Sequence, residues 1–277
     1  MGGIIWLASY PKSGNTWMRS FLQNVILGGQ NTVHINELSQ FAYGDGQKIW
    51  YEQAAGGSID GLSAEQKMKL TPRAHMAMTR SRPQSVFVKT HNWMGLTYDT
   101  HLITMEATAG AIHIIRNPLD VSISLAHHFG FSIDESIEFM SDPEAQTAED
   151  DYKMPQYYGS WSDHTKSWDR LNPQYMHRVR YEDMLTKPGK TFSEVLKFLQ
   201  IKVPKSTLAK AIKQSSFKTL QSQEKKDGFL ERSDKAESFF RSGKAGEWKS
   251  VLTDEQVKKI VDTHHDVMEK YGYLKGL

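Results

Sequence analysis

A short loop near the start of the chain carries residues that suit an anion. Residues 10–17 include Lys12, Ser13 and Thr16 and lead into apolar residues at helical spacing. Backbone N–H groups at a helix N-terminus favour a phosphate, and the lysine and hydroxyls add a charge and donors. Because Lys12 precedes Gly14 instead of following the second glycine, the loop is not a Walker A loop.

Two further groups of candidate residues also follow short apolar runs. Lys89 and His91 come after the run 86–88, and Arg116 comes after the run 111–115. The carboxyl ends of parallel strands share one edge of a sheet, where ligands bind. We therefore expect these side chains at the same edge as the loop. A histidine in that position can remove a proton from a hydroxyl group.

Six segments in one order resemble the cytosolic-type sulfotransferases, which use 3′-phosphoadenosine 5′-phosphosulfate (PAPS) and release its desulfated product PAP. The resemblance covers residues 4–249. The segments that carry it are residues 10–17, 88–91, 114–124, 180–184, 215–217 and 240–249.

The resemblance implies a set of residues that bind the donor nucleotide. They are Lys12, Ser13, Gly14, Asn15, Thr16 and Trp17 in the 5′-phosphosulfate loop, Arg116, Ser124, Arg241, Ser242 and Gly243 at the 3′-phosphate, and Tyr181, Ser215 and Phe217 at the adenine. Trp17 and Phe217 are core aromatics by default, and stacking on the nucleotide is an additional role.

The resemblance also implies the catalytic residues His91, Lys12, Lys89 and Ser124. His91 is expected to act as general base towards the acceptor, while Lys12 neutralises charge on the bridging oxygen of the leaving nucleotide. Lys89 would hold the sulfuryl oxygens, and Ser124 would restrain Lys12 until the acceptor arrives. The expected reaction is in-line sulfuryl transfer to a hydroxyl group, or an amine, of a small-molecule acceptor.

Three positions depart from the family pattern. Ser242 stands where a lysine is usual, which removes one charge and predicts weaker donor binding. Asn15 replaces a frequent threonine, although its backbone N–H can still point at phosphate. Residues 253–255 do not match the common dimer motif, so the oligomeric state stays open.

Two other functions remain open at this point. A P-loop-like nucleotide kinase would share the sheet and the phosphate loop, although the chain has no Walker A loop and no evident Mg²⁺ carboxylate. A non-catalytic PAP- or PAPS-binding protein would keep Arg116 and Ser124, but it would not need His91 and Lys12 together.

The apolar periodicity predicts an α/β fold of three layers, with a mostly parallel central sheet and helices on both faces, as in the P-loop-NTPase-like sulfotransferase fold. One domain is expected over residues 1–277. Strands are expected at Ile4–Ser9, 86–88, 111–115 and 175–181, and helices at 17–26, from Pro118, at 161–168, at 192–199 and from the capping box of Thr253 and Gln256 to Gly272. Residues 221–245 are expected to form a mobile lid, which with residues 31–82 and 93–98 would line the acceptor pocket.

Composition argues against several other classes of protein. Lys and Arg number 34 against 32 Asp and Glu, so the net charge of +2 favours neither nucleic acid nor an anionic membrane as partner. Without cysteine, disulfides and thiolate metal sites are excluded, and the adjacent histidines at 127–128 and 264–265 point apart on a helix. We expect no metal. With no signal peptide or membrane span, the expected location is the cytoplasm.

Overall fold

The protein forms two compact units that interleave along the chain. The computed structural model describes residues 2–275 and 277. The first unit comprises residues 2–10, Ala42–His113 and Asp142–His177, and the second comprises Pro11–Phe41, Ile114–Ser141 and Arg178–Leu277. The single domain expected over residues 1–277 stays a prediction.

A five-stranded sheet in the order β2-β3-β1-β6-β7 holds the strands that lead to the candidate residues. The strands are β1 Ile4–Ser9, β2 Ala42–Gly44, β3 Val86–Thr90, β6 Thr108–Ile115 and β7 Met176–Arg180. β3 pairs in parallel with both β1 and β2. The predicted α/β fold with a mostly parallel sheet is confirmed. Sequence periodicity missed β2, because three residues carry too little pattern.

Two helices of the first unit pack on one face of β1. The further elements of this unit are α3 Lys48–Ala55, α4 Ala64–Met68, β4 Leu96–Thr97, β5 Thr100–His101, the 3₁₀ turns η2 Met105–Ala107 and η3 Pro173–Tyr175, α5 Thr71–Arg80 and α8 Trp161–Trp168. Alternate residues of β1, Ile4 and Trp6 among them, form a core with Met78 of α5 and Trp168 of α8. Because strand side chains alternate between faces, this core covers one face of the strand. The expected core helix at Trp161–Trp168 is confirmed.

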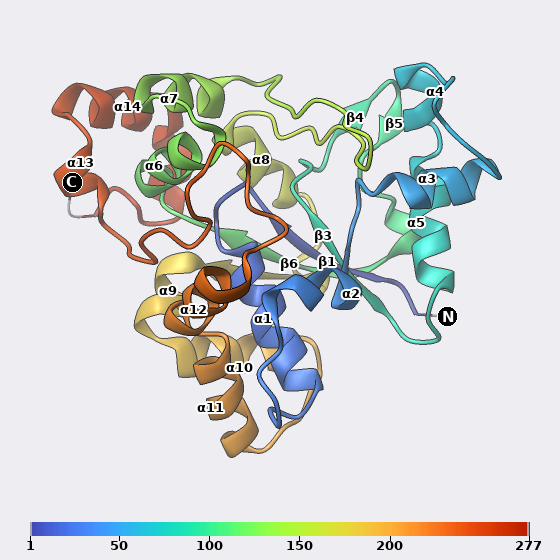
Figure 1. Ribbon diagram of the computed structural model, residues 1–277. Coiled ribbons are helices and arrows are strands. Elements are labelled where there is room, and N and C mark those ends of the chain that lie inside the picture. Colours follow the sequence, from blue (N-terminus) through green and yellow to red (C-terminus); the bar gives the residue numbers. More distant parts are fainter. Residues whose placement is uncertain (1, 276) are drawn as a thin grey trace. The chain divides into compact units, whose positions relative to one another are not determined.

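The regular structure of the second unit is almost entirely helical. Its elements are α1 Asn15–Ile26, η1 Ile35–Glu37, α2 Leu38–Phe41, α6 Pro118–Phe129, α7 Ile133–Ser141, α9 Tyr181–Thr186, α10 Pro188–Phe198, α11 Lys205–Gln214, α12 Phe217–Asp227, α13 Trp248–Val251 and α14 Asp254–Lys270. In Figure 1, α11 lies beside α1 and α10, while α14 lies beside α6 and α7. Across the described residues, no helix is apolar over a length that could traverse a bilayer.

Local sequence signals set the ends of two of these helices. The Asn117 side chain accepts a hydrogen bond from the backbone N–H of Leu119 at 3.0 Å and caps α6. Thr253 and Gln256 form the capping box that begins α14. Both predicted helix starts are confirmed, because a cap needs only residues close in sequence.

Residues 221–245 differ from the irregular lid that the sequence predicts. The first of them, up to Asp227, continue α12, and an irregular stretch follows between α12 and α13. We call residues 228–247 the 228–247 segment; it is the orange-red coil of Figure 1. Phe229 and Phe240 of this segment are buried in a cluster with Ile35, Leu38 and Leu220. Because the segment is mostly polar, its sequence did not indicate that these two aromatic side chains are buried.

Candidate active site

The loop that precedes α1 leaves backbone N–H groups available to an anion. Gly14 is the N-cap of α1 with φ 106°, and no side chain caps the helix. A Cβ added to Gly14 would lie 2.8 Å from the ring of Tyr181, so a larger residue would collide there. Lys12 also has a positive φ, of 64°, which is uncommon for a residue with a side chain. An uncapped N-terminus of this kind favours a phosphate.

Three buried donors among residues 10–17 have no hydrogen-bond partner in the described structure, namely the hydroxyls of Tyr10 and Ser13 and the indole nitrogen of Trp17. A buried donor without a partner can bind an acceptor that belongs to a ligand or an ordered water. Trp17 also contacts Tyr181 and Phe192 edge-on, with centroids 5.8 Å apart in both cases. Trp17 is partly buried and packs against a core cluster, and its contact with a nucleotide stays a prediction.

Arg116 connects the loop to the 228–247 segment. Its Nη1 donates to the carbonyl oxygen of Lys12 at 3.0 Å, and its Nη2 donates to that of Lys244 at 3.2 Å. The guanidinium carbon lies 4.3 Å from the centre of the Tyr181 ring. The side chain is buried, and its Nε has no partner within the described residues. Because a buried guanidinium favours further acceptors, the group suits an additional anion.

The carboxylate of Glu247 lies among three residues that the sequence assigns to the 3′-phosphate. Arg241 donates to both carboxylate oxygens, from Nη1 at 2.8 Å and from Nη2. The hydrogen bonds from Arg241, then the hydrogen bond from Ser242 and the charge of Arg116, lower the pKa of Glu247. An internal anion thus interacts with the residues that are expected to bind the 3′-phosphate.

Lys12 and Gly243 also contact aromatic side chains of the second unit. The Lys12 ammonium lies 3.7 Å from the centre of the Phe239 ring, as a cation–π contact. Gly243 has a φ of 64°, and a Cβ there would lie 2.3 Å from the ring of Phe217. The predicted residues Phe217 and Gly243 therefore lie in direct contact.

Two further predicted residues lie in the second unit, Ser215 at the C-cap of α11 and Ser124 within α6. The Ser215 hydroxyl is buried and donates to the carbonyl oxygen of Ala211 at 2.8 Å, within its own helix end. Ser124 is half-buried on α6. Their contacts with a nucleotide stay predictions.

Sequence reasoning missed two carboxylates that hold these elements together. Buried Asp120 accepts the backbone N–H groups of Gly246 at 2.7 Å and Trp248 at 3.2 Å. Glu182 accepts the backbone N–H of Asn117 at 2.9 Å, and burial raises the pKa of Glu182. Both lie inside segments that carry the family resemblance, but their neighbours in the sequence do not indicate these contacts.

In the first unit, His91 is held in one tautomer by the strand beside it. Its Nδ1 lies 2.7 Å from the carbonyl oxygen of Ser9 and 3.3 Å from the Ser9 hydroxyl. Because a carbonyl oxygen only accepts, Nδ1 carries the proton, and in the neutral ring the lone pair is on Nε2. The register explains the contact, since Ala8 lies opposite Thr90 and the next residues are Ser9 and His91.

A buried carboxylate that sequence reasoning also missed lies near Lys89. Asp45 accepts from the Asn92 amide at 2.8 Å and the Gln156 amide at 2.7 Å. Burial raises the pKa of Asp45. The hydrogen bonds from Thr90 and Asn92 and the positive charge of Lys89 have the smaller, opposite effect of lowering this pKa. The carboxylate of Asp45, which follows β2, is thus hydrogen-bonded to Asn92, which follows β3.

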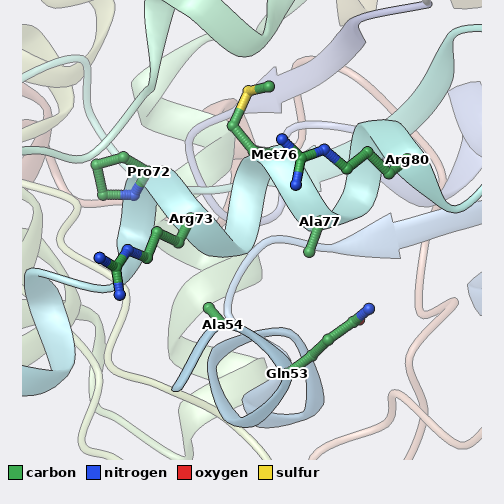
Figure 2. A pocket seen from close by; sticks show the side chains of 7 residues that line it. All are labelled: Gln53, Ala54, Pro72, Arg73, Met76, Ala77 and Arg80. Atoms are coloured by element: carbon green, nitrogen blue, oxygen red, sulfur yellow. The ribbon is translucent and has the colours of Figure 1, made fainter. Parts of the chain in front are cut away.

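A hollow of about 540 Å³ lies on the first unit. Figure 2 shows its lining, with Gln53 and Ala54 on α3 and the remaining side chains on α5. It falls within residues 31–82, the range expected to contribute to the acceptor pocket. Among the described residues, no group of three or more His, Cys, Asp or Glu side chains is placed to hold a metal ion.

Comparison with known proteins gives matches along nearly the whole chain. The model of the sulfotransferase domain family matches residues 4–272. Sulfotransferase 1A1 of Canis lupus familiaris is 25% identical over 275 residues, covering 96% of this chain and 83% of its own length. Sulfotransferase 1B1 of the same species is 26% identical over 266 residues, covering 92% and 80%.

Solved structures show the same fold. A mouse sulfotransferase, SULT7A1, complexed with PAP, superposes with a TM-score of 0.64 at 21% identity and covers 98% of this chain and 88% of its own. Retinol dehydratase in a complex with retinol and PAP gives a TM-score of 0.66 at 19% identity, with 96% and 81% covered.

Proposed function

Because this chain belongs to the sulfotransferase domain family, we propose that it transfers the sulfuryl group of PAPS to a hydroxyl group, or an amine, of a small molecule. The observation that carries the choice of donor is the pair of anion sites in the second unit. One is the uncapped loop with Lys12 and the partnerless Ser13 hydroxyl. The other surrounds Glu247 with Arg241 and Ser242. A nucleotide with phosphates on both sides of its ribose suits two such sites.

The donor-binding residues fit this assignment. The loop Lys12–Trp17 would hold the 5′-phosphosulfate, with Ser13 and Thr16 donating to its oxygens. Arg116, Arg241 and the backbone at Gly243 would hold the 3′-phosphate. The relatives SULT7A1 and retinol dehydratase are both described with PAP, which supports this donor. Retinol dehydratase is also described with retinol and with androsterone, which supports a small-molecule acceptor.

The catalytic step that we propose uses His91 as general base. Nε2 of His91 takes the acceptor proton while the acceptor oxygen forms a bond to sulfur. The bond between sulfur and the bridging oxygen breaks, and PAP leaves with that oxygen. Lys12 would stabilise the charge on the leaving oxygen, Lys89 would hold the sulfuryl oxygens and Ser124 would restrain Lys12. The Ser9 carbonyl supports this role of His91, because it keeps the lone pair on Nε2.

Incubating the protein with PAPS and a mixed panel of phenols, alcohols, amines and sugars tests the proposed function. We expect at least one acceptor to gain the mass of one SO₃ group, with PAP formed in equal amount, as measured by mass spectrometry. Heat-denatured protein is the control. Stoichiometric turnover of ATP with Mg²⁺, together with no sulfated product, would favour the kinase instead.

Glu247→Gln is expected to strengthen the binding of PAP. The glutamine keeps the shape of the side chain but removes the charge that competes for Arg241. Since a partly exposed ion pair contributes up to about 1 kcal/mol, the Kd for PAP should fall by about two- to fivefold. Isothermal titration calorimetry measures the change.

Glu255→Gln is the matched control for this prediction, because it removes the same charge from an exposed position at the start of α14. Its Kd for PAP should equal that of the wild type. Weaker binding by Glu247→Gln would show that Glu247 positions Arg241 for the phosphate and does not compete with it.

A further inference from the structure

A buried arginine on α1 joins the phosphate loop to the 228–247 segment. The guanidinium of Arg19 donates to both carboxylate oxygens of Glu231, from Nη1 and from Nη2, each at 2.7 Å. The same Nη2 donates to the Thr16 hydroxyl at 3.1 Å. The Arg19 side chain is 1% exposed and that of Glu231 is 25% exposed. One planar group therefore contacts both elements.

Stability alone is a weak explanation for this ion pair. The free energy of removing two charges from water is about as large as the free energy gained from their attraction. Apolar residues of similar size often give a protein the same stability. A guanidinium that binds a carboxylate through two hydrogen bonds does, however, fix the position of the two residues relative to each other. The pair suits a role in which α1 and the 228–247 segment must meet in a defined position.

The hydrogen bond to Thr16 has a chemical consequence. An arginine only donates, so the Thr16 oxygen accepts from Arg19 and must direct its own proton to another acceptor. Thr16 stands in the first turn of α1, beside the backbone N–H groups that the proposed 5′-phosphate would approach. The Thr16 hydroxyl can therefore act as a donor towards that phosphate.

Glu231 belongs to the segment that carries the proposed ligands of the 3′-phosphate. In the sequence of the 228–247 segment, Glu231 follows Phe229, which is buried, and precedes Arg241. The same segment contains Gly243. When Arg19 holds Glu231, the segment is held against α1 with its phosphate ligands in place. The two ends of the donor nucleotide are thereby connected through one side chain.

We propose that Arg19 is a positioning residue for the donor site, which aligns the Thr16 hydroxyl and, through Glu231, links the phosphate loop to closure of the 228–247 segment. This inference rests on the proposed donor. It assigns to Arg19 no contact with the nucleotide itself. The coupling means that nucleotide in the loop favours the closed segment, and that the closed segment slows release of nucleotide.

Glu231→Gln tests the proposal, with Glu237→Gln as its control. Both lie in the same segment and remove the same charge, but Glu237 is exposed and contributes no ion pair among those described. We expect the Kd for PAP to rise about tenfold in Glu231→Gln, because the loss of one charge-assisted hydrogen bond weakens binding by about this factor. We also expect the protection of residues 229–246 by PAP in hydrogen exchange to be lost, and the KM for PAPS to rise with little change in kcat. Glu237→Gln should behave as the wild type.

Arg19→Lys and Thr16→Val provide a second route to the same answer. The lysine keeps the charge but cannot bind Thr16 and Glu231 together, so it should reproduce the effects of Glu231→Gln. In a Thr16→Val background, Glu231→Gln should weaken PAP binding by less than it does alone, because part of its effect runs through the missing hydroxyl.

The possible failures are distinguishable. If the wild type binds PAP and Glu231→Gln keeps the wild-type Kd and exchange protection, Arg19 and Glu231 are only structural and the inference is overturned. If the changes in Thr16→Val and Glu231→Gln simply add, the proposed link through Thr16 is wrong. If the wild type itself does not bind PAP, the proposed donor is wrong and the inference falls with it.

Discussion

Replacing Arg116 with lysine is expected to raise the Kd for PAP by about 10²-fold and to abolish the preference for PAP over ADP, because a lysine cannot reproduce a planar fork that serves several acceptors. The side chain already donates to two carbonyl oxygens and has a buried Nε that lacks a partner among the described residues. ADP has no 3′-phosphate and should bind the variant and the wild type alike. Thermal unfolding measures this, since a ligand of the folded state stabilises it by RT ln(1 + [L]/Kd).

Arg178→Lys is a matched control for that experiment. Arg178 also packs on a tyrosine ring, with its guanidinium carbon 4.7 Å from the centre of the Tyr271 ring. The same substitution there should lower the melting temperature without nucleotide but leave the preference for PAP unchanged. If ATP or ADP stabilises the wild type as well as PAP does, the protein has no 3′-phosphate site and the assignment of Arg116 is wrong.

His91→Ala is expected to lower turnover by roughly 10²-fold or more, the usual worth of a positioned general base. The stabilisation of the protein by PAP should remain, because His91 is assigned to the acceptor and not to the donor. The loss should be smaller for acidic phenols, which are partly ionised at neutral pH, than for an aliphatic alcohol. Rates measured over a series of acceptors of graded acidity check this dependence.

A variant of exposed His101 controls for the loss of a histidine in the same unit, and His101→Ala should keep full activity. His91→Asn gives a second test, since its Nδ2 stands where Nδ1 of the histidine does and can still donate to the Ser9 carbonyl while offering no base. An equal loss on all acceptors, or a loss of PAP binding, would show that His91 is structural or holds a sulfuryl oxygen.

The parts of the fold that the sequence predicts are those that local signals define. β1 has the predicted bounds Ile4–Ser9, and α6 begins after its predicted cap Asn117. An apolar run or a cap is complete within a few residues, so its interpretation needs no knowledge of distant partners. The phosphate loop could be proposed for the same reason, because its lysine, hydroxyls and glycine lie close together in the sequence.

The parts that sequence reasoning missed depend on contacts between residues far apart in the chain. Nothing beside Asp120 in the sequence indicates that it accepts from the backbone of Gly246, and nothing beside Arg19 indicates Glu231. The 228–247 segment resembled a loose loop because its charged residues outnumber its apolar ones. Its order comes from Phe229 and Phe240, which are buried by residues near position 35 and position 220.

The bridge that Arg116 makes between Lys12 and Lys244 also bears on how the protein is made. Ribosomes add roughly 5–20 residues per second, and the N-terminal part of a chain begins to fold first. Lys12 therefore emerges long before Lys244, so the nascent chain must keep its phosphate loop without the other half of the site. A bound nucleotide can stabilise only a chain that is almost finished, and a product of interrupted synthesis would be left without that protection from proteases.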